Sequence, residues 1–394
     1  MRRARMLAAA VAAAALGLAG CSGGGGGHTT KEVRAAETMG QGEGQVSLVS
    51  WNGYAEDGSN DPRVDWITPF EKKTKCKVNI KYAANPQEML DLMSKPNLHY
   101  DGVAATPEIA GQLISSRQVV PVNTDLIDSY KELEPALRSQ LTVKGKHYAV
   151  PFTWGANLLM YDQRTVRPQP DSWAALFDPA QAKRYSGHLV VRDSPLTLGD
   201  VALYLRAHDR KLKIKDPFAL TPKQLAAAAK VISRQRPMVK TYWLNPSDAI
   251  AAFATGEASL GEVWPYQVDV LSRSGRPVAG VTPREGVTGW MDSWMMGARA
   301  DHPNCMYQWL NWASSPEVQQ QVAEWDGVAP ANPEACARDR LRPQFCSAYH
   351  VGDRAYLSKI MFARMPAASC TSGKGCADYA DWYHAWQEAR GQTG

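Results

Sequence analysis

Segments that alternate between strand-like and helix-like patterns constrain this chain more than any other feature. The apolar run 46–50 predicts a strand, residues 64–74 predict a helix, and the alternating residues 77–82 predict a second strand. The same succession resumes after residue 149. Strands that alternate with helices predict an α/β fold, in which helices cover a largely parallel sheet.

The remaining elements follow from the same patterns. Further strands are expected over residues 100–104, 149–151, 157–161, 189–191, 258–263 and 290–295. Further helices are expected over residues 87–93, from Pro107 onward, and over 197–208, 222–234, 248–255, 304–313, 316–325 and 378–390.

The chain of 394 residues is longer than one hydrophobic core usually serves, so two lobes are expected. Its 44% hydrophobic and 21% charged residues are ordinary for a globular protein. The formal net charge of +5 includes three arginines near the N-terminus, which leaves +2 on the rest. So weak a charge does not indicate nucleic-acid binding.

The first 21 residues have the organisation of a secretory signal. Three arginines precede an Ala/Leu-rich run that ends at Leu18-Ala19-Gly20-Cys21, which resembles a bacterial lipobox. A lipobox implies cleavage before Cys21 and attachment of lipid to its sulfur. The alternative is an ordinary signal peptide with an incidental cysteine, but residues 22–27 then form a flexible tether of the kind lipoproteins use.

We therefore expect an exported chain that is lipid-anchored at the extracytoplasmic face of the cell membrane, on the cell surface or in the periplasm. Residues 22–45 are Gly-, Thr- and Glu-rich without apolar periodicity, and they are expected to form a disordered tether. Beyond the signal, no apolar run approaches the roughly 20 residues of a membrane span.

Six cysteines remain besides Cys21, and an even number outside the cytoplasm suggests disulfides. Cys370 and Cys376 flank a turn-rich loop, Cys336 and Cys346 are able to close a second ring, and Cys76 and Cys305 would then form a long-range pair. Other pairings remain open. A zinc site is the alternative, but the chain has no Cys-x-x-Cys and no histidine pair with helical ligand spacing, so neither a metal nor a cofactor is expected.

The familiar enzyme motifs are also missing from the sequence. It contains no Gly-x-Ser-x-Gly nucleophile elbow, no His-Glu-x-x-His and no Walker loop. Catalysis would have to depend on scattered residues, and we expect a protein that is not an enzyme.

Aromatic residues follow several predicted strands at their carboxyl ends, where ligands bind in doubly wound sheets. Trp51 and Tyr54 follow the first strand, and Trp264 follows a later one. Trp290 and Asp292 are two residues apart, so in a strand both side chains point to one face. An aromatic face beside a carboxylate suits an organic cation. Tryptophans mostly lie in cores, but that alternative fits several separate strand ends less well.

These positions belong to a series of motifs in a fixed order: Trp51-Asn52-Gly53-Tyr54, Tyr100-Asp101, residues 148–151 with Trp154-Gly155, residues 171–177, Gly256-Glu257 and residues 289–293. Together they resemble the spermidine/putrescine-binding proteins of ABC transporters, from about Val46 to Pro330, with a weaker similarity over residues 379–386. The resemblance implies a two-lobed type II periplasmic-binding fold whose hinge strands let the lobes close around a ligand. It implies this division: signal 1–21, tether 22–45, first lobe 46–155 and 291–335, second lobe 156–290 and 336–394.

The resemblance also implies a ligand site between the lobes. Trp51 and Tyr54 would contact the ligand from the first lobe, Trp264 and Trp290 would sandwich its alkyl chain, and Asp292 would pair with a terminal amine. Thr106 replaces a serine of the family at the tip of its strand.

Several positions depart from the family pattern. The chain has Ser194 and Thr197 where an acidic pair is expected, Glu108 where an aromatic is expected, Val328 in place of a tyrosine, His384 in place of a glutamine, and Gly53 without an acidic side chain. Each buried ammonium of a polyamine needs an anionic partner. Glu108 or Asp193 are candidates to restore the anion that Ser194 and Thr197 do not supply.

The sequence therefore predicts a monomeric, lipid-anchored solute-binding component of an ABC importer that delivers its ligand to a permease. Its ligand is expected to be a polyamine or a related small amine, and a shorter or single-ended amine fits at least as well as spermidine. The alternatives are a different cargo on the same fold, such as an amino acid derivative or an opine-like compound, a surface-anchored enzyme, and an adhesion protein.

Overall fold

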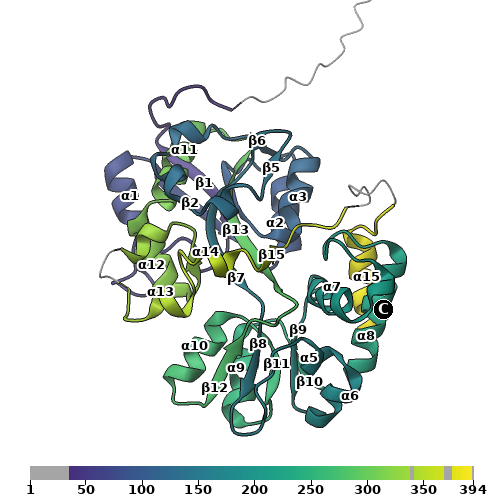
Figure 1. Cartoon of the computed structure of the whole chain (residues 1–394). Coiled ribbons are helices and arrows are strands. Elements are labelled where there is room, and N and C mark those ends of the chain that lie inside the picture. The colour runs from purple at the N-terminus through teal and green to yellow at the C-terminus, as the bar shows by residue number, and fades with distance from the viewer. Residues whose placement is uncertain (1–34, 338–340, 368–374, 393–394) are drawn as a thin grey trace, which may run out of the picture. The chain divides into compact units, whose positions relative to one another are not determined.

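The computed structural model of the chain describes residues 35–337, 341–367 and 375–392 (Figure 1). The expected signal peptide, the lipobox cysteine Cys21 and most of the tether lie outside these ranges. The described chain has two mixed sheets, which form two lobes. The predicted α/β two-lobed fold is confirmed, although antiparallel strands lie beside the parallel ones in both sheets.

The first sheet is built around one long strand, β13, which runs antiparallel to β3, β4 and β7 and parallel to β15. Its strands follow the order β14-β7-β13-β3-β1-β2, with β4 and β15 also paired to β13. Their bounds are β1 Gln45–Ser50, β2 Lys77–Tyr82, β3 Gly102–Ala105, β4 Val119–Val120, β7 Val150–Ala156, β13 Val287–Gly297, β14 Ala329–Pro330 and β15 Ile360–Phe362. Because β1 and β3 are parallel while β13 is antiparallel to β3, the first half of β13 lies at the carboxyl ends of β1 and β3.

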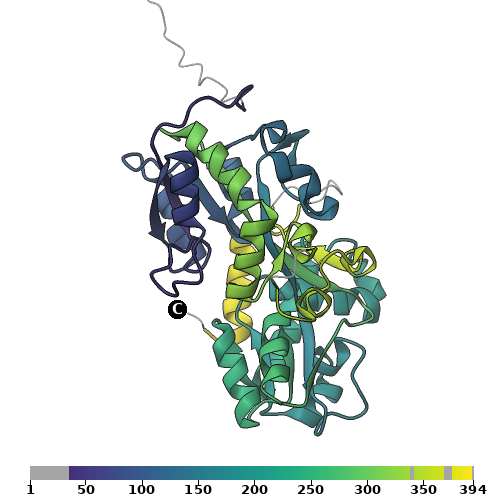
Figure 2. The ribbon, with the colours of Figure 1, turned by 90° about the vertical axis from the view of Figure 1, so that its left-hand side faces the viewer.

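Helices cover both faces of this sheet, and many of them begin with a proline. They are α1 Ile67–Thr74, α2 Pro86–Ser94, α3 Pro107–Ser115, α11 Pro303–Ala313 and α12 Pro316–Asp326, with the shorter α4 Pro135–Arg138, α13 Phe345–Ala348 and α14 Arg354–Leu357. Proline suits the first helical position because the N–H it lacks has no helical partner there. Helices α1 and α11 pack side by side although they are far apart in the sequence (Figure 2).

The core of the first lobe holds several of the tryptophans. The Phe70 and Trp309 rings lie 5.2 Å apart between centroids and the Trp294 and Trp309 rings 5.4 Å apart, each pair edge to face. These rings are almost completely buried. Trp294 and Trp309 are therefore core residues, as most tryptophans are. Only the aromatic residues that follow strands remain candidates for contact with a ligand.

The second sheet has the order β10-β9-β11-β8-β12. Its strands are β8 Leu158–Asp162, β9 Leu189–Arg192, β10 Val239–Trp243, β11 Leu260–Val263 and β12 Val278–Val281, and its helices are α5 Ala174–Phe177, α6 Pro179–Ala182, α7 Thr197–His208, α8 Pro222–Gln235, α9 Pro246–Thr255, α10 Pro265–Arg273 and α15 Tyr379–Arg390. A separate hairpin joins β5 Thr142–Val143 to β6 Lys146–His147. Helix α15, the last element described, packs on α8 (Figure 1).

The chain passes from one sheet to the other near Asn157 and Thr288. Asn157 is the single residue between β7 of the first sheet and β8 of the second, and residues 282–286 lead back from β12 to β13. The backbone N–H of Asn157 donates to the carbonyl of Thr288 at 2.8 Å, so the two crossings are hydrogen-bonded to each other.

The expected lobe boundaries differ from the sheets at Ala156, at residues 287–290, which belong to β13 of the first sheet, and around β15. The short apolar strand β15 pairs in parallel with residues 287–289 of β13, in the first sheet. Residues 336–394 were expected to belong to the second lobe, and within them β15 joins the first sheet instead. Helix α15, further along the chain, packs on α8 of the second lobe, and Arg342 also reaches that lobe through an ion pair with Asp269 of α10.

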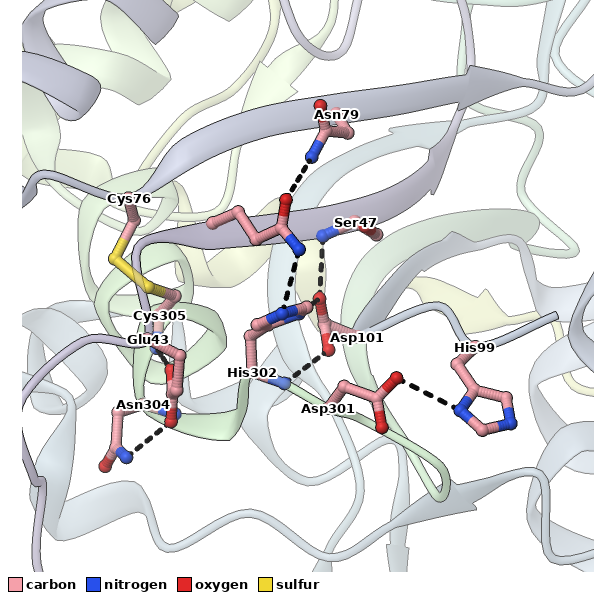
Figure 3. Close-up of polar contacts among 11 residues, drawn as sticks. Glu43, Ser47, Cys76, Asn79, His99, Asp101, Asp301, His302, Asn304 and Cys305 are labelled. Atoms are coloured by element: carbon pink, nitrogen blue, oxygen red, sulfur yellow. Dashed lines mark hydrogen bonds and ion pairs between the residues drawn. A yellow bond between two sulfur atoms is a disulfide. The ribbon is translucent and has the colours of Figure 1, made fainter.

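The start of the first strand is fastened to the beginning of α11 (Figure 3). A disulfide joins Cys76 to Cys305, and the Glu43 carboxylate accepts hydrogen bonds from the backbone N–H groups of Asn304 and Cys305 at 3.0 and 2.9 Å. An anion is favourable at a helix N-terminus, where these N–H groups have no helical partners. We call Glu43, Cys76, Asn304 and Cys305 the N-terminal staple.

Two of the disulfides suggested by the sequence are present, Cys76–Cys305 and Cys336–Cys346. Cys376 is also disulfide-bonded, and its expected partner Cys370 lies outside the described residues. Among the residues described, no helix is both long enough and apolar enough to cross a membrane.

Candidate ligand-binding site

The side chains expected to contact a ligand gather where β1 and β3 end and β13 begins. The pairing of Ser293 with Ala105 brings Asp292 next to Thr106, the first residue after β3. Asp292 is also paired with Thr153 of β7, and Trp51 directly follows β1. Strands β1, β3 and β13 thus bring Trp51, Thr106 and Asp292 together where β1 and β3 end.

Asp292 is a buried carboxyl group with a tyrosine as its hydrogen-bond donor. The Tyr54 hydroxyl donates to Asp292 Oδ2 at 2.8 Å and lies 2.9 Å from Thr153 Oγ1. Both Tyr54 and Asp292 are 7% exposed. Burial raises the pKa of Asp292 to about 8, against the opposing effects of the Tyr54 hydrogen bond and the Arg192 charge. Burial also raises the pKa of Tyr54, so this hydroxyl keeps its proton and remains a donor.

Trp264 and Trp290 form a continuous aromatic wall. Their ring centroids are 5.4 Å apart and the planes are tilted by 57°, so the rings contact each other and do not face each other across the width of an alkyl chain. Trp290 lies over Gly155, where a Cβ would be 2.6 Å from the indole. Trp264 is held by a hydrogen bond from its Nε1 to Asn157 Oδ1 at 2.9 Å. The sandwich geometry expected from the sequence would require these rings to separate.

A guanidinium that the sequence analysis did not single out lies against this wall. Arg192 ends β9 of the second sheet, and its guanidinium carbon lies 5.0 Å from the centroid of the Trp264 ring. Its Nη2 is 3.4 Å from Oε1 of Glu108, in the first turn of α3. Both side chains are largely buried, at 17% and 11% exposed. The Arg192–Glu108 ion pair therefore links the two lobes beside the aromatic wall.

Two buried carboxyl groups of the second lobe lie close to Arg192 and to the crossing strands. Asp200 accepts hydrogen bonds from Asn157 Nδ2 at 3.0 Å and from Thr288 Oγ1 at 2.6 Å. Glu262 accepts one from Thr197 Oγ1 at 3.3 Å. Burial raises the pKa of both carboxyl groups, and the charge of Asp200 raises that of Glu262 further. Thr197, expected to contact the ligand, is thus engaged with Glu262.

A further carboxyl group, from the end of α12, occupies the space beside Gly53. A Cβ on Gly53 would lie 2.2 Å from Asp326 Oδ1, so Asp326 fits against Gly53 because that residue has no side chain. Its Oδ2 is buried without a hydrogen-bond partner in the described parts of the chain. Burial raises the pKa of Asp326 to about 8, and its charge contributes to the raised pKa of Tyr54. Asp326 thus supplies an acidic group next to the position where Gly53 lacks one.

The other predicted contact residues are Ser194, Thr106 and His384, and their surroundings differ from one another. Ser194 Oγ accepts a hydrogen bond from the backbone of Leu196 at 3.2 Å within its own turn. Thr106 Oγ1 is buried, with no partner among the residues that the structure describes. His384 is exposed on α15 and is not brought to the cluster, because the buried face of that helix carries Trp382 and Trp386.

Asp193, which the sequence suggested as a replacement anion, is held by α15 instead. It accepts a hydrogen bond from Trp386 Nε1 at 2.9 Å and forms an ion pair with Arg390. Glu108, the other candidate, is paired with Arg192.

The charges of the site were only partly visible in the sequence. Arg192, Asp326, Glu262 and Asp200 were missed, although Glu262 lies two residues before Trp264 and therefore on the same side of an extended chain. The described residues thus bring together the Arg192 guanidinium, several buried carboxyl groups and an aromatic wall, which are groups that attract charged and aromatic-binding organic groups.

The sequence of this chain matches an established family over residues 65–342, the bacterial extracellular solute-binding proteins. This match covers more than half of the chain, so the chain belongs to that family and is a solute-binding protein, not an enzyme.

Its relatives include the spermidine/putrescine-binding periplasmic protein of Escherichia coli, 25% identical over 297 residues, which cover 75% of this chain and 79% of that protein. The fold is also that of a spermidine/putrescine ABC-transporter substrate-binding protein from Streptococcus pneumoniae, with a TM-score of 0.68, 16% identity, and coverage of 88% and 99% of the two chains. A binding protein from Agrobacterium tumefaciens in complex with glucopine aligns with a TM-score of 0.64, 16% identity, and coverage of 88% and 99%. The chain is therefore a solute-binding protein of ABC transport, distantly similar to spermidine/putrescine-binding proteins.

Proposed function

We propose that this solute-binding protein captures a small solute carrying a cationic amine and delivers it to an ABC-transporter permease. The observation that carries this proposal is the buried Asp292 carboxyl group, with its Tyr54 donor, next to the wall of Trp264 and Trp290. An ammonium group is attracted both by a carboxylate and by the faces of aromatic rings.

The amine would bind beside Asp292, at the carboxyl ends of β1 and β3. A buried carboxylate is unfavourable without a cationic partner, and burial already holds Asp292 largely protonated at neutral pH. An incoming ammonium supplies that partner and restores the charge of Asp292. Asp326, beside Gly53, has the same raised pKa of about 8, so it would supply a second negative charge only when a cation binding nearby draws off its proton. The alkyl part of the solute would lie along the rings of Trp264 and Trp290.

We further propose that the protein acts as a monomer tethered to the extracytoplasmic face of the membrane through lipid on Cys21. The glycine-rich residues 22–27 would give the binding domain reach from its anchor. An anchor of this kind keeps captured solute close to the permease that receives it.

A second cargo class is favoured by one specific observation, the guanidinium of Arg192 on the aromatic wall. A polyamine has no group that such a cation attracts, whereas an amino acid derivative or an opine-like compound has a carboxylate. The fold is shared with a binding protein that holds glucopine, and this agrees with a cargo of that kind.

The proposal is tested by a thermal-shift screen of diamines, polyamines, amino acids and opines, followed by titration calorimetry of the hits. Specific binding stabilises the folded state by about 2.7 kcal/mol at a hundredfold excess of ligand over its dissociation constant. Asp292→Asn is expected to abolish binding of the amine. The exposed Asp171, which pairs with Arg284, provides the matched control Asp171→Asn. Unchanged affinity in Asp292→Asn, or a screen in which no amine stabilises the protein, would contradict the proposal.

A further inference from the structure

The aromatic wall already carries a cation of the protein's own. The Arg192 guanidinium lies over the Trp264 ring at 5.0 Å and is largely buried. A second cation placed on the same ring would displace Arg192 or be repelled by it. A solute with ammonium groups at both ends would therefore meet one favourable end, at Asp292, and one unfavourable end, at Arg192.

Glu108, the partner of Arg192 within the protein, engages one nitrogen of the guanidinium. Glu108 meets it through a single Nη2–Oε1 contact of 3.4 Å, which is longer than a good charge-assisted hydrogen bond. A guanidinium presents five N–H donors in a fork that fits a carboxylate with two parallel bonds. Arg192 therefore retains donors for another carboxylate.

Further donors without partners belong to residues at the carboxyl ends of β1 and β3 and on the adjoining part of β13. The indole Nε1 atoms of Trp51 and Trp290 and the hydroxyl of Thr106 are buried without hydrogen-bond partners in the described part of the chain. An indole N–H is a donor only, so it is satisfied by an acceptor such as a carboxylate oxygen and never by an ammonium group. Thr106 is also the residue that precedes α3, a nine-residue helix whose N-terminus favours negative charge.

From these observations we infer that Arg192 forms a carboxylate subsite, so that the solute is a zwitterion with its amine at Asp292 and its carboxylate at Arg192. An aliphatic ω-amino acid is the simplest such solute. In this arrangement the solute carboxylate takes the place of Glu108 on Arg192, and the site discriminates against diamines. The inference rests on the proposed amine function and names the class of solute that the site selects.

The test uses pairs of probes that differ only at one end. 4-Aminobutyrate and putrescine share one aminoalkyl end, and the other end is a carboxylate in the first and an aminomethyl group in the second. Aliphatic ω-amino acids of three to six carbons, each with its matching diamine, are titrated calorimetrically into the full chain. The wild-type protein is expected to bind the best ω-amino acid about 10- to 100-fold more tightly than its diamine, as expected for a charge-assisted pair.

Two substitutions then separate recognition from structure. Arg192→Gln is expected to weaken binding of the ω-amino acid by about 10- to 100-fold while diamine affinity stays the same or rises, because the repelling cation is gone. Glu108→Gln is expected to strengthen binding of the ω-amino acid, since the internal competitor for Arg192 loses its charge. Asp171→Asn serves as the control and is expected to change neither affinity.

The outcomes distinguish the inference from the proposed function. Equal losses for both probes in Arg192→Gln, or tighter binding of the diamine by the wild-type protein, would overturn the carboxylate subsite and leave the amine function standing. Failure of every amine in both series to bind would overturn both. A selectivity that reverses in Arg192→Gln supports the inference, because loss of folding alone would lower both affinities together.

Discussion

The burial of Asp292 makes amine binding depend on pH in a defined direction. The pKa of this carboxyl group is raised to about 8 by burial, so at pH 6 it is almost entirely protonated. An ammonium ligand requires the ionised form, and the proton must therefore leave when the ligand binds. Each pH unit below the pKa costs about 1.4 kcal/mol. Between pH 8 and pH 6 the affinity is expected to fall about 50-fold, or about 2.3 kcal/mol.

Titration calorimetry at pH 6, 7 and 8 measures this dependence directly. The probe must be an amine that stays protonated throughout, such as putrescine or 4-aminobutyrate. Repeating each titration in two buffers with different ionisation enthalpies counts the protons released, and close to one proton per ligand is expected at pH 6. An affinity that is constant from pH 6 to pH 8, or binding without proton release, would refute the assignment of the amine to Asp292.

The same raised pKa has an effect on the ligand-free fold, with its sign fixed by linkage. A carboxyl group whose pKa is higher in the folded state than in the unfolded chain contributes its stability below the unfolded value, near 4 for aspartate. That contribution is lost as the pH rises through about 8. Asp292→Asn is therefore expected to raise the melting temperature of the empty protein above pH 8, and to change it little at pH 4. A variant that is less stable at pH 9 than the wild type would contradict this account.

Three further predictions concern the frame of the site. Gly155→Ala places a Cβ 2.6 Å from the Trp290 indole, so it is expected to destabilise the fold by about 1–3 kcal/mol in denaturant unfolding and to weaken amine binding, whereas Gly111→Ala in α3, with its nearest contact at 3.4 Å, is expected to be neutral or stabilising. Equal behaviour of the two variants would show that Trp290 does not need the space over Gly155. Asn157→Ala removes the partner of Trp264 Nε1 and a donor to Asp200, and a loss of about 2–4 kcal/mol is expected in the same assay; a loss below 1 kcal/mol would contradict the role of this residue. Replacing Cys76 and Cys305 together by serine is expected to cost about 2–4 kcal/mol in unfolding free energy while leaving amine affinity within about twofold, and a large loss of affinity would show that the N-terminal staple acts on the site itself.

Local patterns predicted the elements well where a clear start signal and periodicity coincide. The helix over residues 197–208 has the predicted bounds, and the helices that begin at Pro107 and Pro222 start where proline favours the first helical position. The strand β15 was missed because three apolar residues carry no periodicity of their own, and its pairing with β13 supplies the order.

The charges of the site were harder to predict, because each depends on a partner far away in the sequence. Arg192 is the last residue of a strand, and nothing near it in the sequence shows that it meets Glu108 from the other lobe. Asp326 fills the space beside Gly53, more than 270 residues earlier in the chain. His384 occupies a family position, but the rotation of α15 decides which side chains point inward, and the buried face of α15 carries Trp382 and Trp386.

The N-terminal staple has a mechanical consequence for a molecule anchored as proposed. Any pull on the tether reaches the folded domain just before β1, where Glu43 and the Cys76–Cys305 bond transfer the load to α11. The load therefore passes through the first lobe alone and bypasses Asn157 and Thr288, at the crossing between the lobes. Thermal drag on the anchor would then leave the crossing between the lobes unloaded, so it would neither open nor close the site.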